Sequence, residues 1–234
     1  MFEKRSEEAE LMDDLQLSND DLRRNLDELE TINYWLGGHK VVLQALEKLL
    51  PELRKSDRPI AIADVGCGGG DMLREIAKWA RRKNLSVVLT GVDANNFMLQ
   101  YAAPKLQNFP EIKLAQHDIF AEDFKNQRFD IITCSLFCHH FSDETLAQML
   151  RQLHGQANVA VIINDLHRHQ LAYYSIKLLT HLFSKSYLVK NDAPLSVLRA
   201  FRKPELEKIL SKAGIKNYQL NWFWAFRWQL VLRK

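Results

Sequence analysis

The chain has 234 residues, of which 47% are hydrophobic and 26% are charged, and these proportions are typical of globular proteins. They exclude a collagen-like or disordered chain, and no apolar run approaches the roughly 18 residues that a membrane-spanning helix needs. The start of the chain lacks the apolar run of a secretion signal, and its three cysteines are too few for a disulfide framework. We therefore expect a cytoplasmic protein in a reducing compartment, with no membrane partner.

The charge is divided between the two ends of the chain. Residues 1–30 hold 11 acidic and 4 basic side chains, a net charge of −7, whereas residues 196–234 hold 9 basic and 2 acidic side chains, a net charge of +7. Two solvated faces, or an acidic arm that lies on a basic surface, explain this division most simply. A basic approach for an acidic partner or substrate is the alternative.

Residues 1–58 form the first predicted segment, a helical leader. Two helices are predicted in it, over residues 17–36 and 39–50, because apolar residues recur there with a helical period. Ser18 or Asn19 is expected to cap the first helix, and acidic residues follow in its first turn.

From Pro59 onward, short apolar strands alternate with helices, which predicts a parallel sheet covered on both faces. The segment over residues 166–200 is longer than a plain strand–helix unit needs. We therefore expect a helical insertion near the carboxyl ends of the strands. The predicted strands and helices before it are, in chain order, 60–65, 72–83, 86–93, 95–106, 111–118, 128–137, 142–154 and 158–165.

The chain closes with a predicted helix over residues 202–213 and two predicted strands over residues 215–221 and 224–234. Four aromatic residues alternate at a period of two in this region, and the alternation predicts that they share one face of a strand. They are Trp222, Trp224, Phe226 and Trp228.

A glycine-rich loop follows the first predicted strand. The sequence from Asp64 to Asp71 reads DVGCGGGD, and such a loop lets the backbone approach a ligand closely. The dinucleotide fingerprint would need glycine at position 71, and no Gly-Lys-Ser/Thr follows to make a phosphate loop. A pyrophosphate would also meet the two negative charges of Asp64 and Asp71. The loop therefore favours a cationic ligand without phosphate, and S-adenosylmethionine fits this description.

Aspartates end the next two predicted strands. A carboxylate in the place of Asp93 can accept hydrogen bonds from both ribose hydroxyls, although Asp93 could also cap the helix that follows. Asp118 could accept a hydrogen bond from an adenine amino group, with Ile119 or Phe120 packed on the base. The alternative for Asp118 is a turn residue.

Four motifs within residues 59–165 resemble those of a known family. ADVGCGGG, GVDAN, QHDIF and FDIITCSLFCHHF together resemble the core of a class I S-adenosylmethionine-dependent methyltransferase, in the small-molecule branch that includes ubiquinone and menaquinone biosynthesis enzymes. The resemblance implies a Rossmann-like α/β fold, with a seven-stranded, mostly parallel sheet, an antiparallel last strand and helices on both faces. Residues 59–234 would form this domain, residues 1–58 an N-terminal helical lid, and residues 166–200 a substrate cover.

The resemblance also implies which residues bind S-adenosylmethionine. The glycine-loop positions would line its methionine part, an aspartate would hold the ribose, two neighbouring pairs would surround the adenine, and a serine would lie near the methionyl group. These residues are, in chain order, Asp64, Gly66, Cys67, Gly68, Asp93, Ala94, Asp118, Ile119 and Ser135.

Histidines and an aspartate near the strand ends are the catalytic candidates. Methyl transfer is an in-line displacement on carbon, so the protein must align the nucleophile and, for a hydroxyl or an acidic carbon, remove a proton. We expect Asp165 or His167 to act as the base or to orient the substrate. His140, one of two adjacent histidines, is the third candidate, and packing or capping is the alternative for each. No metal is expected, because the Cys and His residues after the fourth strand are spaced too closely for a tetrahedral zinc site.

Motifs that are absent from the sequence narrow the range of substrates. After the fourth predicted strand there is no Asn/Asp-Pro-Pro-Tyr/Phe, which the family's amino-group methylators of DNA and of protein glutamine carry, and the sequence has no Pro-Cys. No basic RNA-binding module is recognisable. We expect O- or C-methylation of a small, aromatic or apolar molecule, no nucleic-acid partner, and a homodimer as one option. The side chains expected around this substrate are Tyr34, Trp35, Tyr173, Tyr174, Leu178, Leu179, Leu182 and Phe183.

Three other functions stay open at this point. An RNA or protein methyltransferase is one, and a protein that binds the cofactor without chemistry is the second, because a fold does not imply a function. A dinucleotide oxidoreductase is the third, and the missing glycine at position 71 and the acid at position 64 both argue against it.

Overall fold

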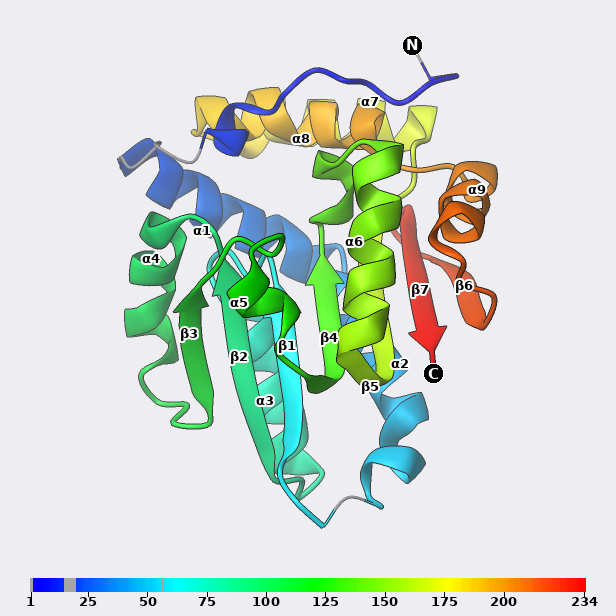
Figure 1. Ribbon diagram of the computed structural model, residues 1–234. Coiled ribbons are helices and arrows are strands. Elements are labelled where there is room, and N and C mark those ends of the chain that lie inside the picture. Colours follow the sequence, from blue (N-terminus) through cyan, green and yellow to red (C-terminus); the bar gives the residue numbers. More distant parts are fainter. Residues whose placement is uncertain (1, 15–19, 56) are drawn as a thin grey trace.

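A seven-stranded sheet forms the centre of the molecule, and helices cover both of its faces (Figure 1). The computed structural model describes residues 2–14, 20–55 and 57–234, so the expected cap residues Ser18 and Asn19 lie outside the described residues. The strand order is β3-β2-β1-β4-β5-β7-β6. The strands are β1 (Ile60–Val65), β2 (Val87–Asp93), β3 (Ile112–Gln116), β4 (Phe129–Ser135), β5 (Ala157–Leu166), β6 (Tyr218–Phe223) and β7 (Arg227–Arg233).

All neighbouring strands run parallel except β7, which is antiparallel to both β5 and β6. This confirms the expected Rossmann-like sheet with an antiparallel last strand. The register places Val65 of β1 beside Cys134 of β4, and Ser135 of β4 beside Asn164 of β5. Because parallel strands end at one edge, the glycine loop after β1 and the histidines after β4 meet at this edge.

Two groups of helices cover the two faces of the sheet. α2, α3 and α4 pack on one face, and α5, α6 and α9 pack on the other. The sequence of α3 favours a helix for two reasons. Its buried apolar residues from Met72 to Ala80 share one side, and basic residues in its last turn stabilise the carboxyl end. The bounds are α2 (Gly38–Leu53), α3 (Asp71–Arg82), α4 (Asn96–Leu106), α5 (Glu122–Lys125), α6 (Asp143–Gln156) and α9 (Lys203–Ala213).

A third group of helices lies across the carboxyl edge of the sheet (Figure 1). The leader supplies the 3-10 helix η1 (Leu11–Asp13) and α1 (Asp20–Trp35), and the insertion supplies α7 (Gln170–Phe183) and α8 (Tyr187–Arg199). Two segments that are far apart in the sequence thus come together above the strand ends. None of the helices in the described ranges is both long enough and apolar enough to cross a membrane.

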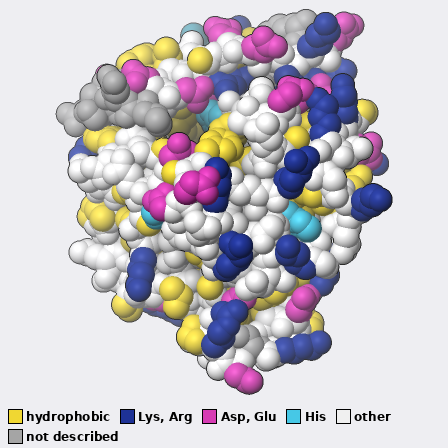
Figure 2. Space-filling view, in the orientation of Figure 1, with side chains coloured by type: hydrophobic (Ala, Val, Ile, Leu, Met, Phe, Trp, Pro, Cys, Tyr) yellow, Lys and Arg dark blue, Asp and Glu magenta, His cyan; other side chains and the backbone are white. Residues whose placement is uncertain are grey.

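Acidic residues of the leader contact basic residues of the remaining chain. Asp13 lies 2.6 Å from Arg199, and Glu30 lies 2.5 Å from Arg74. These contacts agree with the acidic-arm interpretation, although only Arg199 belongs to the basic C-terminal segment. Figure 2 views the face covered by α5, α6 and α9, where basic side chains lie apart from one another and some have acidic neighbours, as Lys212 has in Glu144.

The final two strands differ from the prediction at their junction. β7 begins at Arg227, so Trp224 and Phe226 lie in the turn between the strands, while Trp222 belongs to β6 and Trp228 to β7. The prediction of one shared strand face was therefore wrong. The turn has no glycine at its positive-φ position, which is occupied by Phe226 with a φ of 56°, so the usual sequence signal of a tight turn is absent.

Candidate active site

The glycine loop runs from the end of β1 to the start of α3. Gly66 has a φ of +70°, and a Cβ added there would lie 2.3 Å from the ring of Phe137. Only glycine fits such a position. The amide of Gly68 donates a hydrogen bond of 3.0 Å to Oδ2 of Asp93. The first two motifs of the predicted cofactor site are therefore adjacent.

The two aspartates that follow β2 and β3 bond to nearby backbone. Oδ1 of Asp93 accepts a hydrogen bond from the amide of Asn95, and it is Asn95 that caps α4 through the amide of Phe97. The alternative in which Asp93 caps this helix was therefore wrong. Oδ1 of Asp118 accepts from the amide of Phe120, as expected of a turn residue.

The side chains of several predicted cofactor residues are buried within the protein. Asp64 is 2% exposed and accepts a 2.6 Å hydrogen bond from Oγ1 of Thr133, and burial raises its pKa to about 7. Cys67 and Ile119 turn their side chains into the core, so only their backbone can reach a ligand. Ala94, by contrast, is exposed.

Ser135 ends β4 beside these residues, and its Oγ is buried with no hydrogen-bond partner among the described residues. A buried hydroxyl without a partner is unfavourable in a closed core. It is expected where a bound molecule completes the bonding.

A polar group from the leader lies against the start of α3. Nε2 of His39 lies 2.5 Å from Oδ2 of Asp71, and Nδ2 of Asn33 donates to the same oxygen at 3.2 Å. Burial opposes the charged form of Asp71, but the bond to His39 and its charge outweigh burial and lower the pKa of Asp71. The charge of Asp71 is therefore paired within the protein.

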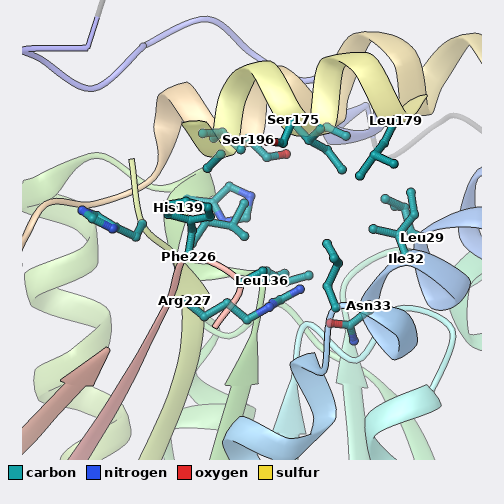
Figure 3. A pocket seen from close by; sticks show the side chains of 18 of the residues that line it. Leu29, Ile32, Asn33, Leu136, His139, Ser175, Leu179, Ser196, Phe226 and Arg227 are labelled. Carbon is teal, nitrogen blue, oxygen red and sulfur yellow. The ribbon is translucent and has the colours of Figure 1, made fainter. Parts of the chain in front are cut away.

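A cavity of about 280 Å³ opens between the strand ends and the helices above them (Figure 3), and its lining includes Asn33, which bonds to Asp71 at the end of the glycine loop. Figure 3 shows Leu29 and Ile32 entering from α1, Leu179 from above, and Leu136 and Arg227 from below. Most of the lining is apolar. The leader, the segment after β4, the insertion and the final hairpin all contribute. The lining residues are Glu10, Met12, Leu29, Ile32, Asn33, Leu36, Leu136, His139, His140, Leu166, His167, Ala172, Ser175, Ile176, Leu179, Ala193, Ser196, Val197, Trp224, Ala225, Phe226 and Arg227.

The wall of this cavity differs from the predicted wall. Of the eight side chains expected there, only Leu179 lines it. The helical period explains the difference, because α7 turns Ala172, Ile176 and Leu179 inward and leaves other apolar side chains outside. Exposed among the expected residues are Tyr34, Trp35, Tyr174, Leu178, Leu182 and Phe183.

His139 and Asp165 form a buried pair at the floor of the cavity. Nδ1 of His139 lies 2.7 Å from Oδ1 of Asp165, and its amide donates to Oδ2 at 3.2 Å. Burial opposes the charge of Asp165, but His139 outweighs it and lowers the pKa of this aspartate. Because the ionised carboxylate can only accept, Nδ1 carries a hydrogen, and in a neutral imidazole Nε2 of His139 then keeps the lone pair.

Glu10 and His140 complete a group around Nε2 of His139. Oε1 of Glu10 lies 3.6 Å from this atom and has no hydrogen-bond partner among the described residues, and burial raises the pKa of Glu10 to about 7. Nδ1 of His140 lies 2.5 Å from Oδ1 of Asp13. Glu10, His139 and His140 could each offer one ligand atom to a metal ion, but Arg199 lies 3.8 Å from Glu10 and its charge opposes a cation.

His167 also lines the cavity, in a different hydrogen-bonding state. Its Nδ1 accepts a 3.2 Å hydrogen bond from Nε1 of Trp222, and burial lowers its pKa. A neutral imidazole that accepts at Nδ1 carries its hydrogen on Nε2. His167 is thus arranged to donate, not to remove a proton.

The structure brings the three predicted catalytic residues to one place, but it gives them roles that the sequence did not predict. Asp165 is 1% exposed and reaches the cavity only through His139. His139, Glu10, Asn33 and Arg227 were not among the predicted site residues. Among these four residues, His139 alone had a signal in the sequence, as one of two adjacent histidines. Glu10, Asn33 and Arg227 come from segments with no motif.

Residues 62–158 match a family model described as a methyltransferase domain. No curated protein matches the chain in sequence. The sequence match covers the glycine loop and the first four strands, and it ends within β5.

Solved structures share the fold at low sequence identity. The plantazolicin methyltransferase BpumL in complex with SAH is 18% identical, with a TM-score of 0.60 and coverage of 90% of both chains. Magnesium protoporphyrin IX methyltransferase from Synechocystis PCC 6803 with bound SAH is 18% identical, with a TM-score of 0.54 and coverage of 84% of both chains. The CMeT domain of the citrinin polyketide synthase is 14% identical, with a TM-score of 0.61, and 82% of this chain spans 52% of that chain. The family model and these solved structures both describe methyltransferases.

Proposed function

We propose that this protein methylates a small, largely apolar molecule on oxygen or carbon. The premise is that the chain contains a class I methyltransferase domain whose cofactor is S-adenosylmethionine. The observation that carries the proposal is the apolar cavity at the carboxyl ends of the strands, which His139 lines with its Nδ1 bonded to Asp165. The cavity is of the size and character of small-molecule sites. Neighbours of the same fold include proteins named as O-methyltransferases and a carbon methyltransferase.

Two features of the structure fit the cofactor. Gly68 has open space where a Cβ would lie, whereas the Phe137 ring fills that space at Gly66, and the buried Oγ of Ser135 lacks a partner among the described residues. Bound there, S-adenosylmethionine supplies an activated methyl group. Asp93 would hold the ribose, because its carboxylate lies at the end of β2 next to Gly68. The adenine would lie near Ala94, Asp118 and the backbone of Ile119.

The protein's part in the chemistry is to align the acceptor and to take its proton. Nε2 of His139 would accept the proton from a hydroxyl or an acidic carbon, and Asp165 would stabilise the imidazolium that forms. His167 would donate a hydrogen bond from Nε2 to an acceptor oxygen. These roles need the acceptor group to lie between the two histidines, which both line the cavity.

The lining favours a substrate with a substantial apolar part. A second cavity of about 450 Å³ between α1 and α7 shares Ile32, Leu36 and Leu179 with the first. Together they would accommodate an aromatic or polyketide-like molecule with an apolar substituent. Membership of the ubiquinone and menaquinone branch is a finer proposal that rests on the sequence resemblance.

Binding of the cofactor is the first test. We expect calorimetric titration to give micromolar or tighter binding of S-adenosylhomocysteine, no saturable binding of NAD, and loss of S-adenosylhomocysteine binding in Asp93→Ala. Saturable NAD binding without S-adenosylhomocysteine binding would contradict the proposal.

Turnover is the second test. We expect the protein to release S-adenosylhomocysteine when it is incubated with S-adenosylmethionine and a panel of phenolic and enolic compounds. The alternative of an RNA substrate predicts instead that RNA binds with a steep dependence on salt concentration. A scaffold without chemistry predicts that His139 and Asp165 variants keep the biological phenotype.

A further inference from the structure

Arg227 is a buried cation without a bonding partner. Its side chain is only 2% exposed, and neither Nε nor Nη1 has a hydrogen-bond partner among the described residues. Burial of a charge without a partner is strongly unfavourable, and burial lowers the pKa of this guanidinium to about 10. Since Arg227 lines the cavity (Figure 3), a ligand can supply the missing partner.

The acids nearest to Arg227 are already committed to other groups. The charges of Asp165 and Asp71 act on the guanidinium, but Asp165 is bonded to His139 and Asp71 to His39. These two carboxylates therefore stabilise the charge of Arg227 from a distance, and the donor atoms of Arg227 stay available to a ligand.

A helix N-terminus lies against the same guanidinium. A Cβ added at Gly38, the first residue of α2, would lie 1.8 Å from Oδ1 of Asn33 and 3.1 Å from Cζ of Arg227, so Asn33 requires glycine here and the guanidinium lies close beside it. α2 has 16 residues, and the free amides at the N-terminus of such a helix favour an anion. Two independent features thus favour negative charge at one point.

Polar atoms without partners surround this point on one face of the sheet. Asn164 pairs with Gln229 in the register, and Gln229 shares its face with Arg227 two residues away. Oδ1 of Asn164, Oδ1 of Asn33 and Oγ of Ser135 all lack partners among the described residues. Acceptors of this kind suit an ammonium group, so the surroundings match a ligand that carries both charges.

We propose that Arg227 and the N-terminus of α2 form a carboxylate receptor, and that its occupant is the methionine carboxylate of the methyl donor. A guanidinium binds a carboxylate through two parallel hydrogen bonds. The donor is favoured over the acceptor molecule as the source because Asn33 connects this point to Asp71, which directly follows the glycine loop. The inference rests on the proposed function and assigns a role to a residue outside the matched domain.

The test is a cycle of two ligands and two proteins, measured by calorimetry. The ligands are S-adenosylhomocysteine and S-adenosyl-3-thiopropylamine, which lacks only the carboxylate. We expect the wild-type protein to bind the amine about 10- to 100-fold more weakly than S-adenosylhomocysteine, and Arg227→Gln to bind both ligands equally. Arg233→Gln, on the same strand but paired with Glu52 at the surface, should behave like the wild-type protein.

Thermal unfolding separates a binding defect from a folding defect. Arg227→Gln removes an unpartnered buried charge, so its unfolding midpoint should be no lower than that of the wild-type protein. Arg227→Lys keeps the charge but not the two parallel bonds, and it should bind S-adenosylhomocysteine with intermediate affinity.

The remaining outcomes are also decisive. If Arg227→Gln keeps the preference for S-adenosylhomocysteine, the S-adenosylhomocysteine complex is titrated with octanoate. Binding of octanoate that needs Arg227 would support the receptor with the acceptor molecule as its source, and binding independent of Arg227, or none, would overturn the proposal. If the wild-type protein binds neither adenosyl ligand, the proposed function fails, and octanoate titration of the free protein decides the receptor alone.

Discussion

Hydrogen-bond partners decide what each histidine of the cavity can do. His139 and His140 are adjacent, and each directs Nδ1 to a carboxylate, that of Asp165 or of Asp13. His167 instead accepts from an indole N–H, which has the opposite effect on its second nitrogen. The three histidines are therefore of two kinds: Nδ1 faces a carboxylate in His139 and His140, and it accepts a hydrogen bond in His167. The composition of the site alone does not reveal this difference.

Replacement of His139 by Asn should lower kcat by about 100- to 10,000-fold, because it removes the proton acceptor. The rate should also lose the acidic limb of its pH dependence. Asp165→Asn should have a similar effect, because an amide can donate to Nδ1 and move the imidazole hydrogen to Nε2. His140→Asn is the matched control and should keep more activity. A larger loss in His140→Asn than in His139→Asn would assign the base to His140.

Asp64 should make stability depend on pH. Burial raises its pKa to about 7 from the ordinary value of 3.8, so between these two pH values the native state holds a proton that the unfolded state has lost. The stability contributed by this proton is present at low pH and declines as the pH rises through this range. Asp64→Asn should therefore be more stable than the wild-type protein at pH 8, by up to about 4 kcal/mol.

Urea unfolding at pH 8 and at pH 4 measures this difference. The advantage of Asp64→Asn should shrink to less than about 1 kcal/mol at the lower pH, where the native carboxyl is protonated and that of the unfolded chain is about 40% protonated. An advantage independent of pH would contradict the assignment.

At the scale of the elements, α7 separates two kinds of apolar side chain. Ile176 and Leu179 face the cavity, whereas Leu178 and Leu182 are exposed, at 59% and 61%. The helical period produces both faces. A helix with apolar side chains on both faces does not identify its inner face, and this is why most of the predicted side chains lie outside the first cavity, although Trp35 and Phe183 line the second.

A larger side chain on the inner face should exclude substrate. Ile176→Trp should raise KM for the acceptor by about 10-fold or more, since a small change of volume in an apolar pocket has effects of this size. The affinity for S-adenosylhomocysteine should stay unchanged, because the change is remote from the glycine loop. Leu178→Trp, on the outer face, is the control. Equal effects of the two variants would contradict the cavity as the acceptor site.

At the scale of the whole molecule, the leader lines the cavity and bonds to distant segments. Arg5 donates to a carboxylate oxygen of Asp143 at 2.7 Å and to the carbonyls of His139, Phe141 and Arg199. One leader side chain thus joins the segment from His139 to Phe141 to the end of α8. α2 is anchored by its buried apolar residues against the sheet, whereas Arg5 joins residues 2–14 to the insertion and to the segment after β4.

Arg5→Gln should loosen the leader. Loss of a part-buried charged hydrogen-bond network corresponds to about a 10-fold larger population of the open form. We expect limited proteolysis within the leader to accelerate by a similar factor, and KM for the acceptor to rise. Lys4→Gln, an exposed neighbour, should change neither. An unchanged proteolysis rate in Arg5→Gln would show that other contacts hold the leader.

Local patterns in the sequence determined the strand and helix order, the glycine loop and the class of cofactor. These features depend on neighbours along the chain, such as the apolar period of α3 and the run from Asp64 to Asp71. The sequence also predicted that Asp165, His140 and His167 would gather, because parallel strands end at one edge.

Only the tertiary structure decided which nitrogen of each histidine faces the cavity and which acids are paired. The bonds of His139 to Asp165 and of His39 to Asp71 join residues that are 26 and 32 positions apart. Arg227 gave no signal in the sequence, because its environment is made by α2 and by strands from other parts of the chain. Burial and hydrogen bonding between distant segments set the chemistry of these groups, and no local pattern encodes them.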